Sequence, residues 1–162
     1  MTQNVQRCAE ISLPALQTLL GAYGLQVAML PENADIPGSY WGAPEAGLVL
    51  DTLYIRPDTP THSALHEAGH WICMDDARRA KLHTDAGGTV LEECAVNYLQ
   101  ILLAEALPDV GRKQLLSDMT TWGYSYREGS VYAWLEGDAA DAIAWLQQRG
   151  LIDAQRQRIT HR

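Results

Sequence analysis

The stretch His66-Glu67-Ala68-Gly69-His70 decides how this chain is expected to fold, and it has the pattern H-E-x-x-H. Around it, Leu65, Ala68 and Trp71 recur at helical spacing and form an apolar stripe. Two residues four positions apart lie on the same face of a helix, so both imidazoles can bind one metal ion. Glu67 follows the first histidine and can reach a metal-bound water without displacing it. The stretch therefore predicts a metal site on a helix, with Glu67 as general base.

A helix is expected over residues 59–74. Thr59-Pro60 is typical of a helix start, with Thr59 as N-cap and Pro60 at the first helical position. Two β-prone runs precede it, residues 48–50 and 53–55, and they form either a hairpin or one longer strand. A strand that leads directly into the helix would suit a metal site at the edge of a sheet.

A catalytic zinc site needs a third protein ligand, with one position left for water. The candidates are Glu92 and Glu93, at the start of a helix expected over residues 91–107. Adjacent helix positions point about 100° apart, so only one of the two can face the metal. Glu93 is favoured because Asn97 and Gln100 continue its face, and a polar group there can hydrogen-bond a ligating histidine. Glu92 is then a solvated or capping neighbour. The competing interpretation makes both glutamates ordinary solvated residues of a helix start.

Two imidazoles and a carboxylate suit Zn²⁺, although Mn, Fe or Co can also occupy such a site. The expected activity is that of a zinc metallopeptidase, in which a metal-activated water hydrolyses a peptide bond and Glu67 acts as general base. A zinc amidase acting on a non-peptide bond would use the same residues. The alternative is a non-enzymatic, zinc-stabilised module that binds or regulates another protein. Glu67 favours the enzyme, because a structural zinc site has no use for a base beside the water position.

The remaining elements are predicted from periodicity and from punctuating glycine and proline residues. They are a helix over 12–20, a strand over 25–30, and loops over 31–44 and 75–88. A third helix, capped by Asp109, is expected to run to about residue 121. A hairpin follows within 124–135, for which a helical start is the alternative, and a last helix over 138–148 is capped by Asp138.

Other conspicuous residues have their own predictions. His62 shares the face of His66 and is expected at the surface or beside a ligating histidine. Cys73 and Cys94 are expected to be small core residues, and Trp71 and Tyr98 are expected in the core. The aromatic pair at positions 40 and 41 either lines a substrate cleft or packs against the domain. Four residues are candidates for stabilising an oxyanion, none of them preferred: Tyr124, Tyr126, Tyr132 and His83.

Length and composition favour one globular domain over residues 1–162, with a mobile tail at 153–162. The net charge of −8 argues against nucleic acid or an anionic membrane as the main partner. The first residues do not form a secretory signal, and no apolar run is long enough to span a bilayer. Three cysteines without paired spacing argue against a disulfide framework, so a cytoplasmic location is expected.

His66-Glu67-x-x-His70 followed by Glu93-Cys94-Ala95-Val96-Asn97 resembles the zincin-like metallopeptidases with a distant glutamate ligand. Among these it is most similar to the small ImmA/IrrE-type proteins of bacteria and their mobile elements. The resemblance covers about residues 48–108. It departs from the family in two places: Val96 stands where an alanine is usual, and the proline that ends the glutamate helix comes later than usual.

This resemblance implies a compact α+β fold, a zincin-like minimal domain with a small sheet packed against the HExxH helix and the glutamate-bearing helix. It also implies a zinc ion held by His66, His70 and Glu93. The implied activity is selective cleavage of a cytoplasmic polypeptide, such as a regulatory protein.

Overall fold

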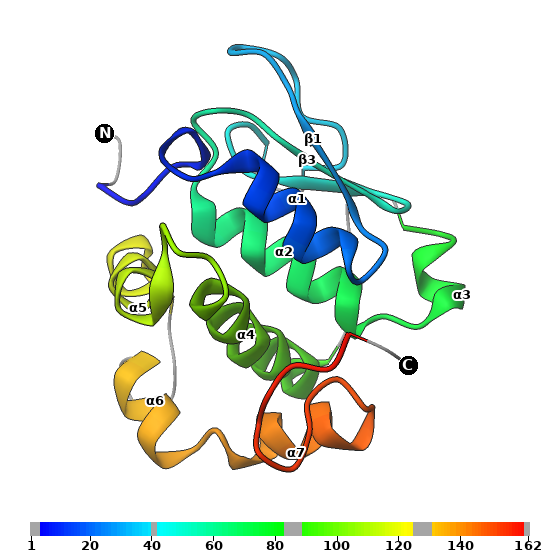
Figure 1. The fold of residues 1–162 in the computed structure, drawn as a ribbon, viewed down its shortest axis with the longest axis vertical. Coiled ribbons are helices and arrows are strands. Elements are labelled where there is room, and N and C mark those ends of the chain that lie inside the picture. Colours follow the sequence, from blue (N-terminus) through cyan, green and yellow to red (C-terminus); the bar gives the residue numbers. More distant parts are fainter. Residues whose placement is uncertain (1–3, 40–41, 83–88, 125–130, 161–162) are drawn as a thin grey trace.

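The helix that carries both histidines, α2 (Thr61–Cys73), lies between a small sheet and a second long helix, α4 (Val90–Glu105) (Figure 1). The computed structural model describes residues 4–39, 42–82, 89–124 and 131–160. Over these residues the fold is α+β, with a three-stranded sheet and seven α-helices. The predicted α+β class with a small sheet is therefore confirmed. The sheet packs against α2, and α4 lies on the other side of α2.

The sheet has the strand order β1-β3-β2. Strand β1 (Gln26–Met29) runs parallel to β3 (Thr52–Ile55), and β2 (Gly47–Val49) pairs antiparallel with β3. The two β-prone runs before the metal helix thus form a hairpin. A strand lies directly before α2, as expected: it is β3, the central strand of the sheet. Strand β2 lies at one edge.

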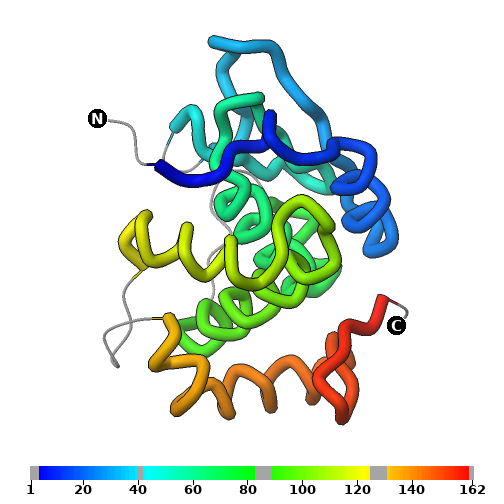
Figure 2. The backbone as a smooth tube through the Cα atoms, turned by 60° about the vertical axis from the view of Figure 1, so that its left-hand side comes forward, coloured from blue at the N-terminus to red at the C-terminus, as the bar shows by residue number. Residues whose placement is uncertain are grey.

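The other helices cover the two ends of the molecule. Figure 2 shows the sheet and α1 at one end and the later helices at the other, with α2 between them. The bounds are η1 (Cys8–Glu10), α1 (Leu13–Gly21), α3 (Asp76–Arg79), α5 (Gly111–Trp122), α6 (Val131–Gly137) and α7 (Ala140–Gln148).

Helices α2 and α4 approach each other closely at Gly69. A Cβ atom at this position would lie 3.0 Å from Cγ1 of Val96 and 3.4 Å from its carbonyl oxygen. The surrounding side chains are fully buried, among them Leu65 and Ile72 on α2 and Leu99 on α4. Glycine is therefore the residue that lets the two helix backbones come this near. Trp71 and Tyr98 are buried as predicted.

Three predicted helix caps are wrong, because two of the side chains bond elsewhere and all three helices begin later. The Thr59 hydroxyl donates to the carbonyl of Pro44 and accepts the N–H of Arg56, and Pro60 is the N-cap of α2. The Asp109 carboxylate accepts the N–H of Ser12 at 3.0 Å, which ties α1 to the start of α5. The N-cap positions of α5 and α7 are Val110 and Ala139, so Asp138 does not cap α7.

One loop and a hairpin were predicted where the structure has helices. The loop over 75–88 contains α3, which Asp75 caps by accepting the N–H of Arg78. The hairpin predicted within 124–135 is wrong where the structure describes it, because α6 begins at Val131. Val131 and Trp134 are both buried, and their spacing of three places them on one helix face.

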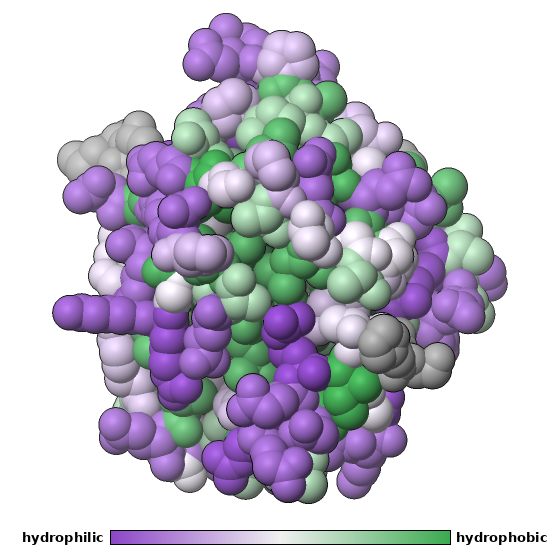
Figure 3. All heavy atoms as spheres, viewed as in Figure 1, coloured by the Kyte–Doolittle hydropathy of each residue, from purple (hydrophilic) through white to green (hydrophobic). Residues whose placement is uncertain are grey.

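The surface mixes polar and apolar side chains. On the face in Figure 3, hydrophilic residues surround a central strip of hydrophobic ones. Among the described residues, no helix is long and apolar enough to cross a membrane. The described part of the C-terminal tail folds back on the domain, with the N–H of Ile159 donating to the carbonyl of Leu151. Mobility of residues 153–162 stays a prediction.

The close approach at Gly69 leads to a stability prediction. Gly69→Leu should lower the free energy of unfolding by about 1–3 kcal/mol, because the added side chain meets Val96 and overpacks the interface. Gly21→Leu is the matched control, since nothing lies within 4 Å of a Cβ atom at that helical position. Chemical denaturation monitored by circular dichroism measures both. Equal stability of the two variants would contradict the tight contact.

Candidate metal centre

Three potential metal ligands meet between α2 and α4. Nε2 of His66 lies 2.9 Å from one carboxylate oxygen of Glu93, and Nε2 of His70 lies 3.0 Å from the other. All three ligand atoms lie within 4.8 Å of one another. The structure therefore brings together the three residues that the sequence singled out, and this cluster could hold a metal ion.

The spacing of these atoms fits a tetrahedral ion. Ligands at about 2.1 Å from zinc lie about 3.4 Å apart in a tetrahedral site. The distances from Nε2 of His66 and Nε2 of His70 to the Glu93 oxygens are 2.9 and 3.0 Å. Each would therefore lengthen by only about half an ångström to admit the ion. The side chain of His70 is nearly buried, whereas 47% of the Glu93 side chain is exposed. The cluster thus has a protein-enclosed side and a side open to a further ligand.

The electrostatics of the cluster suit a cation. Burial alone would lower the pKa of His66, but its hydrogen bond and charge interaction with Glu93 raise that pKa overall. Burial also opposes ionisation of Glu93, but the hydrogen bonds from His66 and His70 lower the pKa of this carboxyl. Glu93 therefore stays ionised between two imidazoles, and its negative charge is available to a metal ion.

Gln100 fixes which nitrogen of His66 is free to bind metal. The Gln100 amide is fully buried, and its Nε2 donates to the carbonyl of His62 at 2.8 Å. A carbonyl can only accept, so Oε1 of Gln100 must be the atom that faces Nδ1 of His66, at 3.2 Å. Nδ1 of His66 therefore donates its hydrogen to Gln100, and Nε2 is the nitrogen that faces Glu93. Nε2 is thus the nitrogen that would bind a metal ion, after giving up the hydrogen it shares with Glu93.

The predicted partner of the histidines was Asn97, and this prediction is wrong. Oδ1 of Asn97 and Nδ1 of His70 are both buried, and neither has a hydrogen-bond partner among the described residues. The next polar residue on the same stripe, Gln100, takes the role instead. The sequence gives the polar stripe of α4, but the packing of α2 against α4 decides which of its members reaches a histidine.

Glu92 is neither solvated nor a cap, so that prediction is wrong as well. Its side chain is buried and makes two bonds to the Arg78 guanidinium, at 2.8 and 2.9 Å. The helix cap is Thr89, whose hydroxyl accepts the N–H of Glu92 at 3.1 Å. The adjacent glutamates thus have different tasks: Glu92 binds α3 to α4, and Glu93 faces the histidines.

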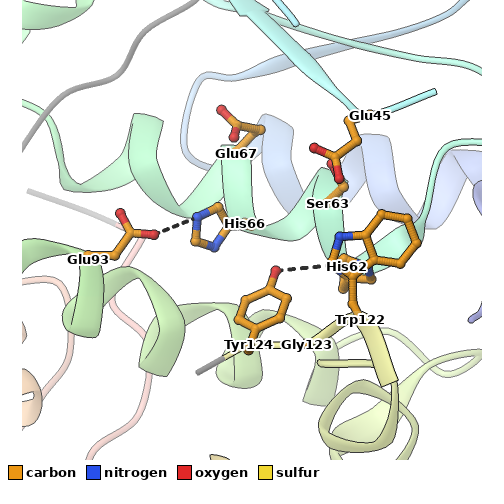
Figure 4. A pocket seen from close by; sticks show the side chains of 9 residues that line it. All are labelled: Glu45, His62, Ser63, His66, Glu67, Glu93, Trp122, Gly123 and Tyr124. Atoms are coloured by element: carbon orange, nitrogen blue, oxygen red, sulfur yellow. Dashed lines mark hydrogen bonds and ion pairs between the residues drawn. The ribbon is translucent and has the colours of Figure 1, made fainter. Parts of the chain in front are cut away.

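A cavity of about 450 Å³ opens beside this cluster, within the size range of ligand pockets (Figure 4). Glu67 lines it together with the ligand residues His66 and Glu93. Burial raises the pKa of Glu67, while the nearby His66 and His70 act in the opposite direction. The full lining is Glu45, His62, Ser63, His66, Glu67, Glu93, Trp122, Gly123 and Tyr124.

One of the four oxyanion candidates lies at the site. Tyr124 lines the cavity, and its hydroxyl contacts Nδ1 of His62 at 3.0 Å and accepts a hydrogen bond from Nε2 of Gln100 at 3.3 Å. Burial raises the pKa of Tyr124, so the phenol stays neutral. Tyr132 lies on α6 and is exposed. Tyr126 and His83 lie outside the described residues, as does the aromatic pair at positions 40 and 41.

His62 is more buried than predicted. Only 1% of the residue is exposed, and burial lowers its pKa to about 3, so the ring is neutral. Of the two predicted positions, the surface position is wrong. The position near His66 fits, because Gln100 bonds both His62 and His66. Cys73 is buried as expected, whereas Cys94 is partly exposed.

Four lining residues were not predicted from the sequence: Glu45, Ser63, Trp122 and Gly123. Ser63 lies one helical turn before the HExxH stretch, and this spacing could have identified it. Glu45 lies in a loop and Trp122 ends α5, so only the tertiary fold brings them to the cavity. No protein-family model, curated protein or solved structure matches this chain.

The adjacent glutamates give a matched test of the third ligand. Glu93→Ala should weaken zinc binding by at least about 100-fold, because it removes a ligand outright. Glu92→Ala should keep zinc affinity and instead lower the free energy of unfolding by about 1–3 kcal/mol, because it removes two bonds to Arg78. Competition with a chromophoric chelator measures the affinities. The reverse pattern would assign the ligand role to Glu92.

Gln100 gives a test of histidine orientation. Gln100→Leu should weaken zinc binding by about 10- to 100-fold, because the hydrogen bond that fixes His66 is lost. Gln148→Leu, on an exposed position of α7, is the control and should bind zinc as the native protein does. The same chelator competition applies. Unchanged affinity in Gln100→Leu would show that His66 does not need this partner.

Proposed function

We propose that this protein is a zinc-dependent peptidase with a zincin-like site, and that it hydrolyses peptide bonds of a cytoplasmic polypeptide. One observation carries the proposal: Glu67 lines the same cavity as His66 and Glu93, two members of the candidate ligand cluster that His70 completes. A purely structural metal site would gain nothing from such a base. It would also more often close its fourth position with another cysteine or histidine.

The donor set supports zinc as the metal. Two imidazole nitrogens and one carboxylate oxygen form a three-ligand set that leaves a fourth position open, as in catalytic zinc sites. When bound there, zinc would supply Lewis-acid chemistry, polarising the scissile carbonyl and bringing the pKa of water to about 7. The residues of the chain provide everything else that hydrolysis needs.

Glu67 moves the proton. Its carboxylate takes a proton from the attacking water as the C–O bond forms, and later delivers that proton to the amine nitrogen as the C–N bond breaks. Burial raises the pKa of Glu67 and brings it closer to neutral pH, where one carboxylate serves best first as base and then as acid. Its position directly after His66 keeps it beside the cluster without competing for the metal.

Tyr124 is the candidate for stabilising the developing oxyanion. Nε2 of the neutral His62 is buried and has no hydrogen-bond partner among the described residues. A buried N–H without an acceptor is costlier than an unused lone pair. The hydrogen of His62 therefore belongs on Nδ1, from where it is donated to the Tyr124 hydroxyl. That oxygen then accepts from both His62 and Gln100, and its own hydrogen is free to point into the cavity.

The general base gives the direct test of this proposal. Glu67→Gln should retain about one zinc per chain, because Glu67 is not a ligand, but should lower peptide cleavage by about 10²- to 10⁴-fold. The substrate for this test is a pool of peptides from a digested bacterial proteome, with new termini counted by mass spectrometry. Metal content is measured on the same samples.

Two results would contradict the peptidase. Native protein that holds zinc but produces no new termini would favour the alternative, a zinc-stabilised binding or regulatory module. Cleavage that survives unchanged in Glu67→Gln would show that the activity does not use this site. A Glu136→Gln variant, altered on α6 outside the cavity lining, controls for the loss of one negative charge.

A further inference from the structure

The cavity wall on the far side of His66 from Glu93 carries a carboxylate that the proposed hydrolysis does not use. This residue is Glu45, which precedes β2 and lies beside Ser63 and Trp122 (Figure 4). Glu67 lies between the two ends of this row. The cavity is therefore bordered by acid groups both at the ligand cluster and at its opposite end.

Glu45 is held firmly in place. Its N–H donates to the carbonyl of Gly42 at 3.1 Å, and its own carbonyl accepts the Ser39 hydroxyl at 3.0 Å. The next N–H, of Ala46, donates to the Ser63 hydroxyl at 3.1 Å and ties the loop to α2. Trp122 lies beside the carboxylate and lowers its pKa, against the larger effect of burial. The position of Glu45 in the wall is thus set by its loop and by α2, with Trp122 of α5 beside it.

Among the described residues, no basic side chain balances the charge at this wall. The described part of the cavity lining contains three glutamates and no lysine or arginine. Glu93 contacts both ligand histidines, whereas no ion pair joins Glu45 to a lysine or arginine in the described parts of the chain. Arg7 lies 5.9 Å from the centre of the Trp122 ring but does not line the cavity. Burial raises the pKa of Glu45, so a cation in the cavity would stabilise its ionised form.

We propose that Glu45 is a specificity-determining residue, which selects polypeptides carrying a lysine or arginine side chain beside the scissile bond. This inference rests on the proposed peptidase function, because it assigns a substrate class to the same cavity. A charge-assisted hydrogen bond in a half-buried wall discriminates between a cationic side chain and an apolar one of equal length by about 10- to 100-fold. An acidic side chain at the same place is repelled by Glu45.

The test measures binding and does not depend on turnover. The probes are peptide hydroxamates, whose hydroxamate group binds zinc, in pairs that differ only in lysine against norleucine. One pair carries the variable residue on the N-terminal side of the hydroxamate, and a second pair carries it on the C-terminal side. Titration calorimetry on the zinc-loaded full chain compares native protein, Glu45→Gln and the charge control Glu136→Gln.

In native protein and in Glu136→Gln, the lysine compound of at least one pair should bind about 10- to 100-fold more tightly than its norleucine partner. In Glu45→Gln the two should bind alike, with norleucine affinity unchanged. Equal binding of lysine and norleucine to native protein in both pairs would overturn the role of Glu45, and so would a preference that survives Glu45→Gln. Failure of all four probes to bind would instead overturn the proposed metal site, and this inference with it.

Discussion

The close approach of α2 to α4 is the constraint on which the site depends. The two histidines stand on α2 and the third candidate ligand on α4, so the ligand atoms meet only if the helix backbones come near each other. Gly69, inside the HExxH stretch, faces Val96 so closely that a Cβ atom would lie only 3.0 Å from Cγ1 of Val96. The same pentapeptide thus supplies the two histidines, the proposed base and the residue at the close approach. Packing and chemistry are encoded together in this stretch.

Buried hydrogen bonds extend this arrangement from the ligand cluster to the cavity. Gln100 bonds His66, the backbone of His62 and the hydroxyl of Tyr124 from a single fully buried amide. A buried amide must satisfy both its donor and its acceptor, so the orientation of the Gln100 amide is fixed. This orientation decides which ring nitrogen of His66 bonds Gln100 and which one faces Glu93. The geometry of one ligand and the placement of Tyr124 in the cavity wall are therefore linked through one side chain.

The sequence predicts the parts of the site that depend on local spacing. Residues four apart on one helix share a face in any fold, so His66 and His70 could be placed without a structure, and Glu93 followed from the helix that carries it. Partners decided by tertiary packing could not be predicted. Glu92 pairs with Arg78 of α3, Asp109 bonds α1 instead of capping α5, and Glu45 reaches the cavity from a loop. A short polar side chain can cap its own helix or bond a distant backbone group equally well. The sequence alone does not show which of these two bonds forms.

The central claim is that one zinc ion lies between α2 and α4. A crystal structure of the zinc-loaded protein, with anomalous data collected at the zinc absorption edge, tests it most directly. The account predicts one peak per chain at about 2.0–2.2 Å from Nε2 of His66, Nε2 of His70 and a carboxylate oxygen of Glu93. A peak at another set of side chains, or none between these three residues in zinc-saturated crystals, would contradict it.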